Sequence, residues 1–194
     1  MGLVVVTPPV REPVSVEEVK AQLRVDYADE DGLIAAYIGA ARETLERLLW
    51  RAFITQTLAL TLDAWPEGNA IRLPRPPLQV VSAVTWTDAV GAVHVLDAGT
   101  YAVDTTSEPG RVVLRAGQAW PGSALAPAAG VRVTYTAGYG DEADTVPEAI
   151  RQAIRLLAAH WFEHREAVSE AKALEEVPMG VWWLVEPLRA VRFE

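Results

Sequence analysis

The sequence predicts a mixed α+β protein, in which a helical bundle of about four helices carries an antiparallel β-rich insert between the second and third helices. Two changes of hydrophobic period indicate this fold class. Apolar residues follow a helical spacing up to about residue 53, alternate with polar residues to about residue 140, and then return to the helical spacing. The predicted segments are N-terminal helices of the helical body (1–53), a β-rich insert (54–140), a long helix of the same body (141–176) and a C-terminal segment (177–194).

Two helices are predicted before the insert. Ser15 and Glu18 have the spacing of a capping box, in which each side chain accepts a hydrogen bond from the other residue's backbone, so a short helix begins after Ser15. A longer helix is predicted over residues 31–51, because its apolar residues form a broad stripe along one face. This stripe consists of Leu33, Ile34, Tyr37, Ile38, Ala41, Leu45, Leu48 and Leu49.

Seven strands are predicted in the insert. The first is "ITQTLALTLD", in which polar and apolar residues alternate as they do in a half-buried strand. The proline-rich residues 74–77 are expected at an edge or in a connection, because proline cannot donate to a sheet ladder. Turns rich in Gly, Pro and Asp separate the other strands, which are predicted over residues 70–73, 80–88, 93–96, 101–104, 111–114 and 131–139.

A long helix is predicted after the insert, from Pro147 to about residue 171. Thr145 or Asp144 is the expected cap, with Pro147 in the first turn. A break at residues 175–180 and a shorter apolar segment, "VWWLVEPLRAVRFE", follow this helix.

The helix carries a candidate metal site, because His160 and His164 lie one turn apart on the same face. A zinc-protease helix places a glutamate directly after its first histidine, but Trp161 stands there. The chain has no cysteine, and its third histidine is the distant His94. We therefore interpret the pair as ordinary helix residues and expect no metal and no cofactor. A metal-dependent hydrolase that uses His160, His164 and a carboxylate is the alternative.

Composition narrows the function classes further. The 194 residues carry a formal net charge of -9, which argues against tight binding of nucleic acid through clustered Lys and Arg. The absence of cysteine excludes a disulfide framework and a cysteine nucleophile. The longest uncharged stretch, residues 116–131, is interrupted by prolines and glycines, so no membrane span or membrane partner is expected. No nucleophile elbow is present, and we expect no enzymatic activity.

Tryptophan provides two candidate binding surfaces. Trp182 and Trp183 are adjacent and cannot both face the same core, so one of them is expected to meet a partner. Interface hot spots are enriched in Trp and Arg. The candidate interface consists of Trp182, Trp183, Leu188, Arg189, Arg192 and Phe193. A third functional alternative, a carbohydrate-binding β module, would need Trp65, Trp86 and Trp120 exposed on one sheet face.

The order of several segments resembles a known family. These segments are "ITQTLALTLDAWP", "IRLPRPPLQVVSAVTW", "YAVDTTSEPGRVVL" and "TAGYGDEADTVPEAIRQAIRLLAAHWFEHREAV". In this order they resemble the head-tail connector (adaptor) family of tailed bacteriophages and phage-like gene transfer agents. The resemblance covers nearly the whole chain. It implies that the "HWFEHREA" helix belongs to a structural helical body.

The same resemblance implies a structural role without catalysis. Copies of the chain are expected to form a ring, a dodecamer in this family, beneath the portal protein of the capsid and to seat a stopper or tail-completion protein. DNA is expected only to pass through the channel. The candidate interface is then the portal-docking surface. The implied location is the head-tail interface of a virion or phage-like particle that is assembled in the bacterial cytoplasm.

Overall fold

The chain folds into two units, each built from segments that are distant in the sequence. The structure is a computed structural model and describes residues 1–164 and 178–190. One unit, called here the helical unit, comprises residues 11–54 and 140–189. The other, called the β unit, comprises residues 1–10, 55–139 and 190–194.

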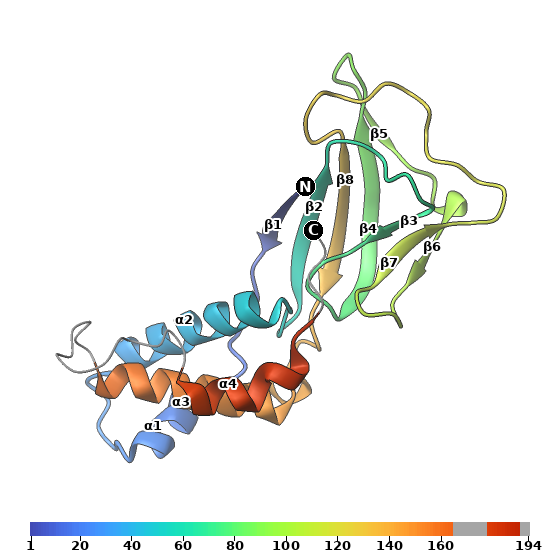
Figure 1. Cartoon of the computed structure of the whole chain (residues 1–194). Coiled ribbons are helices and arrows are strands. Elements are labelled where there is room, and N and C mark those ends of the chain that lie inside the picture. The colour runs from blue at the N-terminus through green and yellow to red at the C-terminus, as the bar shows by residue number, and fades with distance from the viewer. Residues whose placement is uncertain (165–177, 191–194) are drawn as a thin grey trace. The chain divides into compact units, whose positions relative to one another are not determined.

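The β unit contains a five-stranded antiparallel sheet in the order β1-β2-β8-β4-β5 (Figure 1). β8 lies at its centre and pairs with β2 on one side and β4 on the other. β1 and β5 are the edge strands. The five strands are β1 (Gly2–Thr7), β2 (Gln56–Leu62), β4 (Leu78–Thr87), β5 (Val93–Val95) and β8 (Val131–Ala137).

A second, three-stranded antiparallel sheet has the order β3-β7-β6. It consists of β3 (Ala70–Arg72), β7 (Arg111–Leu114) and β6 (Tyr101–Asp104), with the short 3-10 helix η1 (Ala98–Thr100) before β6. Its Ile71 and Val112 are buried, as are Leu60 and Val133 of the larger sheet. The buried Tyr135 hydroxyl donates to the Pro74 carbonyl at 2.7 Å, which satisfies the one polar atom of this side chain inside the core.

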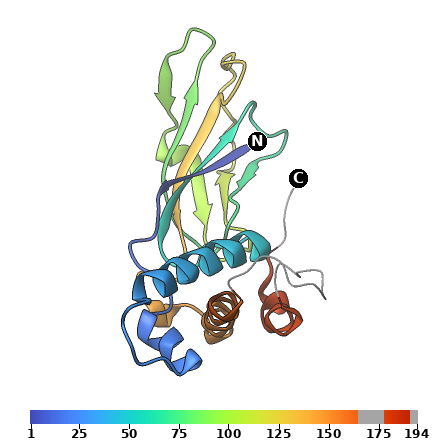
Figure 2. The same cartoon turned by 90° about the vertical axis from the view of Figure 1, so that its left-hand side faces the viewer.

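The helical unit consists of α1 (Val16–Leu23), α2 (Asp31–Leu49), α3 (Glu148–Glu163) and α4 (Met179–Val185), with the 3-10 turns η2 (Ala143–Thr145) and η3 (Glu186–Leu188). α3 packs against each of the other three helices. Figure 2 views α3 nearly end-on, with α1 and α4 on either side of it.

The core of the helical unit lies between the apolar stripes of α2 and α3. These residues are at most 1% exposed: Ile34, Ile38, Ala41, Leu45 and Leu49 of α2, and Ile150, Ala153, Ile154, Leu157 and Ala158 of α3. Burial of each large aliphatic side chain stabilises the fold by about 1.5–3 kcal/mol. The helical spacing of these residues therefore determines which face of each helix turns inward.

The predicted α+β class is confirmed: residues 1–164 and 178–190 form four α-helices and antiparallel sheets. Two local expectations differ from the structure. β1 was not predicted, although it pairs with β2 along Gly2–Thr7. Pro147 itself is the N-cap residue of α3, so the prediction of Thr145 or Asp144 as the cap is wrong. α3 is described as far as Glu163, and residues 165–171 of the predicted helix lie outside the described residues.

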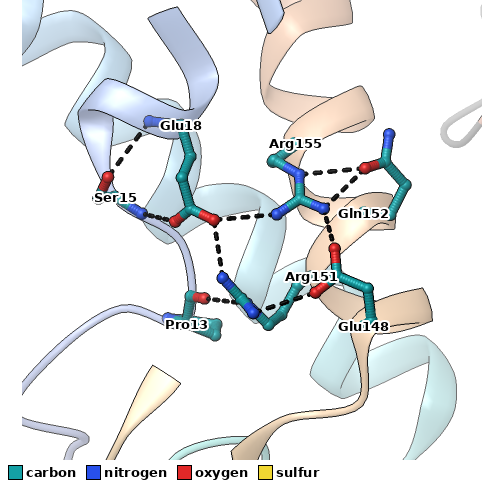
Figure 3. Close-up of polar contacts among 7 residues, drawn as sticks. All are labelled: Pro13, Ser15, Glu18, Glu148, Arg151, Gln152 and Arg155. Atoms are coloured by element: carbon teal, nitrogen blue, oxygen red, sulfur yellow. Dashed lines mark hydrogen bonds and ion pairs between the residues drawn. The ribbon is translucent and has the colours of Figure 1, made fainter. Parts of the chain in front are cut away.

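A polar network joins α1 to α3 (Figure 3). The capping box is formed as predicted: Ser15 N–H donates to Glu18 Oε2 at 2.8 Å, and Glu18 N–H donates to Ser15 Oγ at 3.2 Å. The other oxygen of Glu18, Oε1, accepts from Arg151 at 2.7 Å and from Arg155 at 3.0 Å. One carboxylate therefore both caps α1 and binds two cations of α3.

The two arginines are held in place by further partners. Arg151 also donates to the Pro13 carbonyl at 3.1 Å and pairs with Glu148 at 3.0 Å. Arg155 contacts Glu148 as well. The hydrogen bond from Arg155 lowers the pKa of Glu148 below its ordinary value.

A second charge cluster fixes α2. Arg42 is 8% exposed and pairs with Glu12 at 2.7 Å and with the buried Glu46 at 3.1 Å. Glu46 Oε1 also accepts from the backbone N–H of Phe53 at 2.8 Å, beyond the end of the helix. The segment before α1 and the segment after α2 are thus both tied to the middle of α2.

The double role of Glu18 predicts a stability difference between two neighbouring charge-neutralising variants. Glu18→Gln replaces one acceptor oxygen by an NH2 group that faces arginine donors, and should lower the free energy of unfolding by about 1–3 kcal/mol. Glu17→Gln removes the same charge from an exposed position of the same turn and should lower the unfolding midpoint less, because the hydrogen bonds that hold the pKa of Glu17 below its ordinary value come from the backbone and Ser15 at the start of α1. Urea denaturation of both variants measures the difference. Equal midpoints would show that the network of Figure 3 contributes nothing to stability.

Candidate partner-binding site

The candidate interface begins on α4 and continues through η3. Four of its six residues, Trp182, Trp183, Leu188 and Arg189, are described by the structure. The other two, Arg192 and Phe193, lie outside the described residues.

α4 has one buried and one exposed side. Val181 and Val185, one turn apart, are at most 3% exposed, and α4 packs against α3. Successive residues of a helix are rotated by about 100°, so neighbours of a buried position point elsewhere. Trp183 is 67% exposed and Met179 is 62% exposed, whereas Trp182 is half-buried. The expectation that the adjacent tryptophans face different surroundings is confirmed.

The chain after α4 is fixed to the helical unit. Arg51, which is 7% exposed, donates from Nε to the Leu188 carbonyl. Arg189 N–H donates to the Glu186 carbonyl at 3.0 Å, which closes the turn of η3. Leu188 is half-buried and the Arg189 residue is exposed. α4 and η3 therefore place an exposed indole and an exposed arginine in the same ordered segment.

This arrangement suits recognition of a protein surface. A large exposed aromatic side chain on a rigid helix loses little conformational entropy when it becomes buried, and it removes much apolar area from water. Indole and guanidinium groups are over-represented among interface hot spots.

A shallow groove on the helical unit was not predicted from the sequence. Its lining comes from the segment before α1, from α1, α2 and η2, and consists of Glu12, Val14, Ser15, Val16, Glu18, Ala35, Ile38 and Ala143. Both carboxylates of the lining already pair with arginines of the helical unit. The other lining residues of the groove, apart from Ser15, are apolar. No local signal could have revealed it, because its residues come from three separate parts of the sequence.

The two histidines of the alternative hydrolase contact each other at the end of α3. Their ring centroids are 4.5 Å apart. His164 is the C-cap residue, and both its backbone N–H and its Nδ1 lie 3.0 Å from the His160 carbonyl oxygen. Nδ1 of His164 therefore carries the proton and donates to that oxygen. Across residues 1–164 and 178–190, no three His, Cys, Asp or Glu side chains are grouped so that they could hold a metal ion.

The tryptophans of the β unit pack on one another. Trp65 and Trp120 stack with centroids 4.9 Å apart, Trp86 tilts against Trp65 at 6.2 Å, and His94 stacks on Trp86 at 4.9 Å. All three indoles are half-buried, and Trp120 Nε1 donates to the Gly68 carbonyl at 2.8 Å. A carbohydrate-binding module would need these tryptophans exposed on one sheet face. They do not form such an exposed surface, so this expectation is wrong.

None of the helices in the described part of the chain combines the length and the apolar composition that crossing a bilayer requires.

Comparison with known proteins identifies the family. A family model described as "Head completion protein" matches residues 12–174, which is most of the chain. The chain belongs to the head completion protein family. No curated protein sequence matches the chain.

Solved structures agree with this assignment over the whole length of the chain. A chain from the "Neck of empty GTA particle computed with C6 symmetry" is similar with a TM-score of 0.81 and 28% identity. A chain from the "Virion of native gene transfer agent (GTA) particle" is similar with a TM-score of 0.80 and 29% identity. A third, from the "Neck of native GTA particle computed with C12 symmetry", has a TM-score of 0.75 and 27% identity. Each comparison covers 100% of this chain and 98% of the other. The predicted resemblance to a head-tail connector of phage-like particles is confirmed.

The geometry of His160 and His164 predicts that this head completion protein binds no stoichiometric zinc. The two rings contact each other, and one ring nitrogen is used by a backbone carbonyl, so two further ligands would have to come from elsewhere. Elemental analysis of protein purified without chelator should find well under one zinc per chain. One tightly held zinc per chain, lost in a His160→Ala variant, would support the hydrolase alternative instead.

Proposed function

We propose that this head completion protein is a head-tail adaptor that forms a ring beneath the capsid portal, joins the head to the stopper or tail, and surrounds the channel through which DNA passes. Membership of the family and similarity to chains from the necks of gene transfer agent particles support this function. A structural role in the particle follows from the same comparisons. The ring is proposed to contain twelve copies and to be added in the bacterial cytoplasm.

The proposal assigns a task to each part of the chain. The helical unit is proposed to dock beneath the portal, with residues 55–139 of the β unit between its second and third helices in the sequence. Residues 1–10, which the predicted bounds 1–53 assign to the helical body, instead belong to the β unit and contain β1. The C-terminal segment 177–194 is proposed to contact the portal itself. The observation that carries this assignment is the exposed Trp183 on a helix whose opposite side is buried.

The distribution of charge supports a channel that does not retain DNA. The chain has 26 acidic and 17 basic residues. Seven of the acidic and six of the basic residues lie in the β unit. The helical unit contains the other 19 acidic and 11 basic residues. The helical unit therefore carries a formal charge of -8 and the β unit one of -1. A carboxylate-rich surface repels phosphates, whereas clustered Lys and Arg would bind DNA by releasing counterions. We assign the channel-facing surface to the helical unit.

Portal docking through α4 predicts a binding defect without a folding defect. Trp183→Ala removes an exposed indole and should weaken binding to the purified portal protein at least about tenfold, because buried tryptophans are frequent hot spots. Its unfolding midpoint should match that of the unsubstituted chain. Deletion of residues 181–194 should also prevent joining to the capsid, but it removes the buried Val181 and Val185 and is therefore the less specific change.

Tyr27→Ala provides a matched control for this experiment. Tyr27 is an aromatic residue that is 48% exposed, lies between α1 and α2, and stands outside the proposed interface. It should bind the portal normally. Normal portal binding by Trp183→Ala would place the docking surface elsewhere on the chain.

The charge of the helical unit also predicts that the free protein is largely monomeric. Copies placed side by side bring helical units of charge -8 together, and this repulsion must be offset by contacts with the portal. Sedimentation at micromolar concentration and physiological salt should show mainly monomer, and added salt should increase association. A stable closed ring in the absence of portal would contradict this prediction.

A further inference from the structure

The five-stranded sheet of the β unit has one face turned away from the core, called here the outer face. Along β2 and β8, Leu58, Leu60 and Val133 point into the core, so the residues between them lie on the opposite face. The strand pairings arrange this face in four rows across the strands. These rows are Gly2-Thr61-Arg132-Thr85-Val95, Val4-Ala59-Thr134-Ala83, Thr7-Thr57-Thr136-Val80 and Thr87-Val93.

The outer face carries no carboxylate, and Arg132 is its one charged residue. Its other members are threonine, valine, alanine and glycine, of which Ala59 is 1% exposed and most of the threonines are half-buried. Four of its valines, Val4, Val80, Val93 and Val95, are between 52% and 70% exposed. A solvent-facing sheet surface of an acidic protein normally carries charged residues, and edge strands in particular carry charges that prevent association. The two edge strands, β1 and β5, contain no Asp, Glu, Lys or Arg.

We propose that neighbouring copies of this chain contact one another through the outer face in the assembled neck. The proposal rests on the adaptor function and names the surface that closes the ring. Each copy places its outer face against a different surface of the β unit of the next copy, because a ring is built from heterologous contacts. The cyclic symmetries with which the similar necks were computed are consistent with a repeated contact of this kind.

Charge favours a second copy as the occupant. A contact between identical acidic chains becomes less favourable with every carboxylate brought to the interface, and the outer face brings none. The β unit as a whole carries a formal charge of only -1, so two β units approach each other almost without repulsion. A basic partner protein would instead be attracted to the helical unit.

The absence of cysteine from the chain allows a direct test. Val80→Cys and Val95→Cys place a single thiol on exposed positions of the outer face, and Gln22→Cys places one on an exposed position of α1 as a control. Each variant is assembled into particles, labelled with a thiol-reactive benzophenone and irradiated. Cross-linked peptides are then identified by mass spectrometry. Labels on the outer face should yield dimers of this chain joined through its β unit, and the α1 label should not.

The outcomes separate this inference from the adaptor function. If the variants enter particles but their outer-face labels join another particle protein, or only the same copy, the ring contact is overturned and the adaptor function stands. If the unsubstituted chain is absent from the particle neck, both fail. Self-dimers of equal yield from the Gln22→Cys label would also overturn the assignment to the outer face.

A substitution at the centre of the face gives an independent measurement. Thr134→Glu adds a carboxylate to every copy of the proposed contact, whereas Thr134→Gln adds a neutral side chain of the same size. Thr134→Glu should reduce the amount of chain per particle several-fold, and Thr134→Gln should not, with both variants equally stable in solution. Equal incorporation of the two would contradict the contact.

Discussion

The pairing of β2 with β8 is the constraint on which the two-unit architecture depends. β2 begins two residues after Ile54, β8 ends three residues before Gly140, and the two strands pair in register from Gln56 opposite Ala137 to Leu62 opposite Val131. The long segment of the β unit, residues 55–139, therefore begins and ends in adjacent strands, and Ile54 and Gly140 form a bridge of their own. Because this segment starts and finishes in adjacent strands, α2, which precedes it, can pack against α3, which follows it. The buried core of the helical unit and the polar network around Glu18 both depend on the packing of α3 within this unit.

Most elements were predictable because their signals are local. The strands over residues 101–104 and 111–114 have the predicted bounds, and the capping box at Ser15 forms as its spacing indicates. β1 was missed because "GLVVVT" shows no polar alternation and its partner β2 lies some fifty residues away in sequence. The packing of Trp65 against Trp120 and the absence of carboxylates from the paired positions of the outer face depend on strand register and loop placement, which periodicity does not determine. The sequence predicts that one of Trp182 and Trp183 faces outward, because adjacent helix residues cannot share one face, and the structure shows that it is Trp183.

The physical properties of the two units suit different contacts. The helical unit carries nearly all of the net charge and presents an exposed tryptophan on a short helix, whereas the β unit is almost neutral and presents a sheet face rich in threonine and valine. In the proposed adaptor ring, a contact between acidic copies favours a surface without carboxylates, whereas a channel that does not retain DNA favours a carboxylate-rich surface. Separation of the acidic surface from the neutral one allows a single chain to satisfy both.

Electron microscopy of particles from cells that lack this gene tests the adaptor function most directly. The adaptor function predicts heads and tails that accumulate separately, with no tail at the portal vertex, and restoration of tailed particles when the gene is supplied from a plasmid. Tailed particles of normal morphology and yield from the deletion strain would contradict it, because a protein that joins the head to the tail cannot be dispensable for that junction.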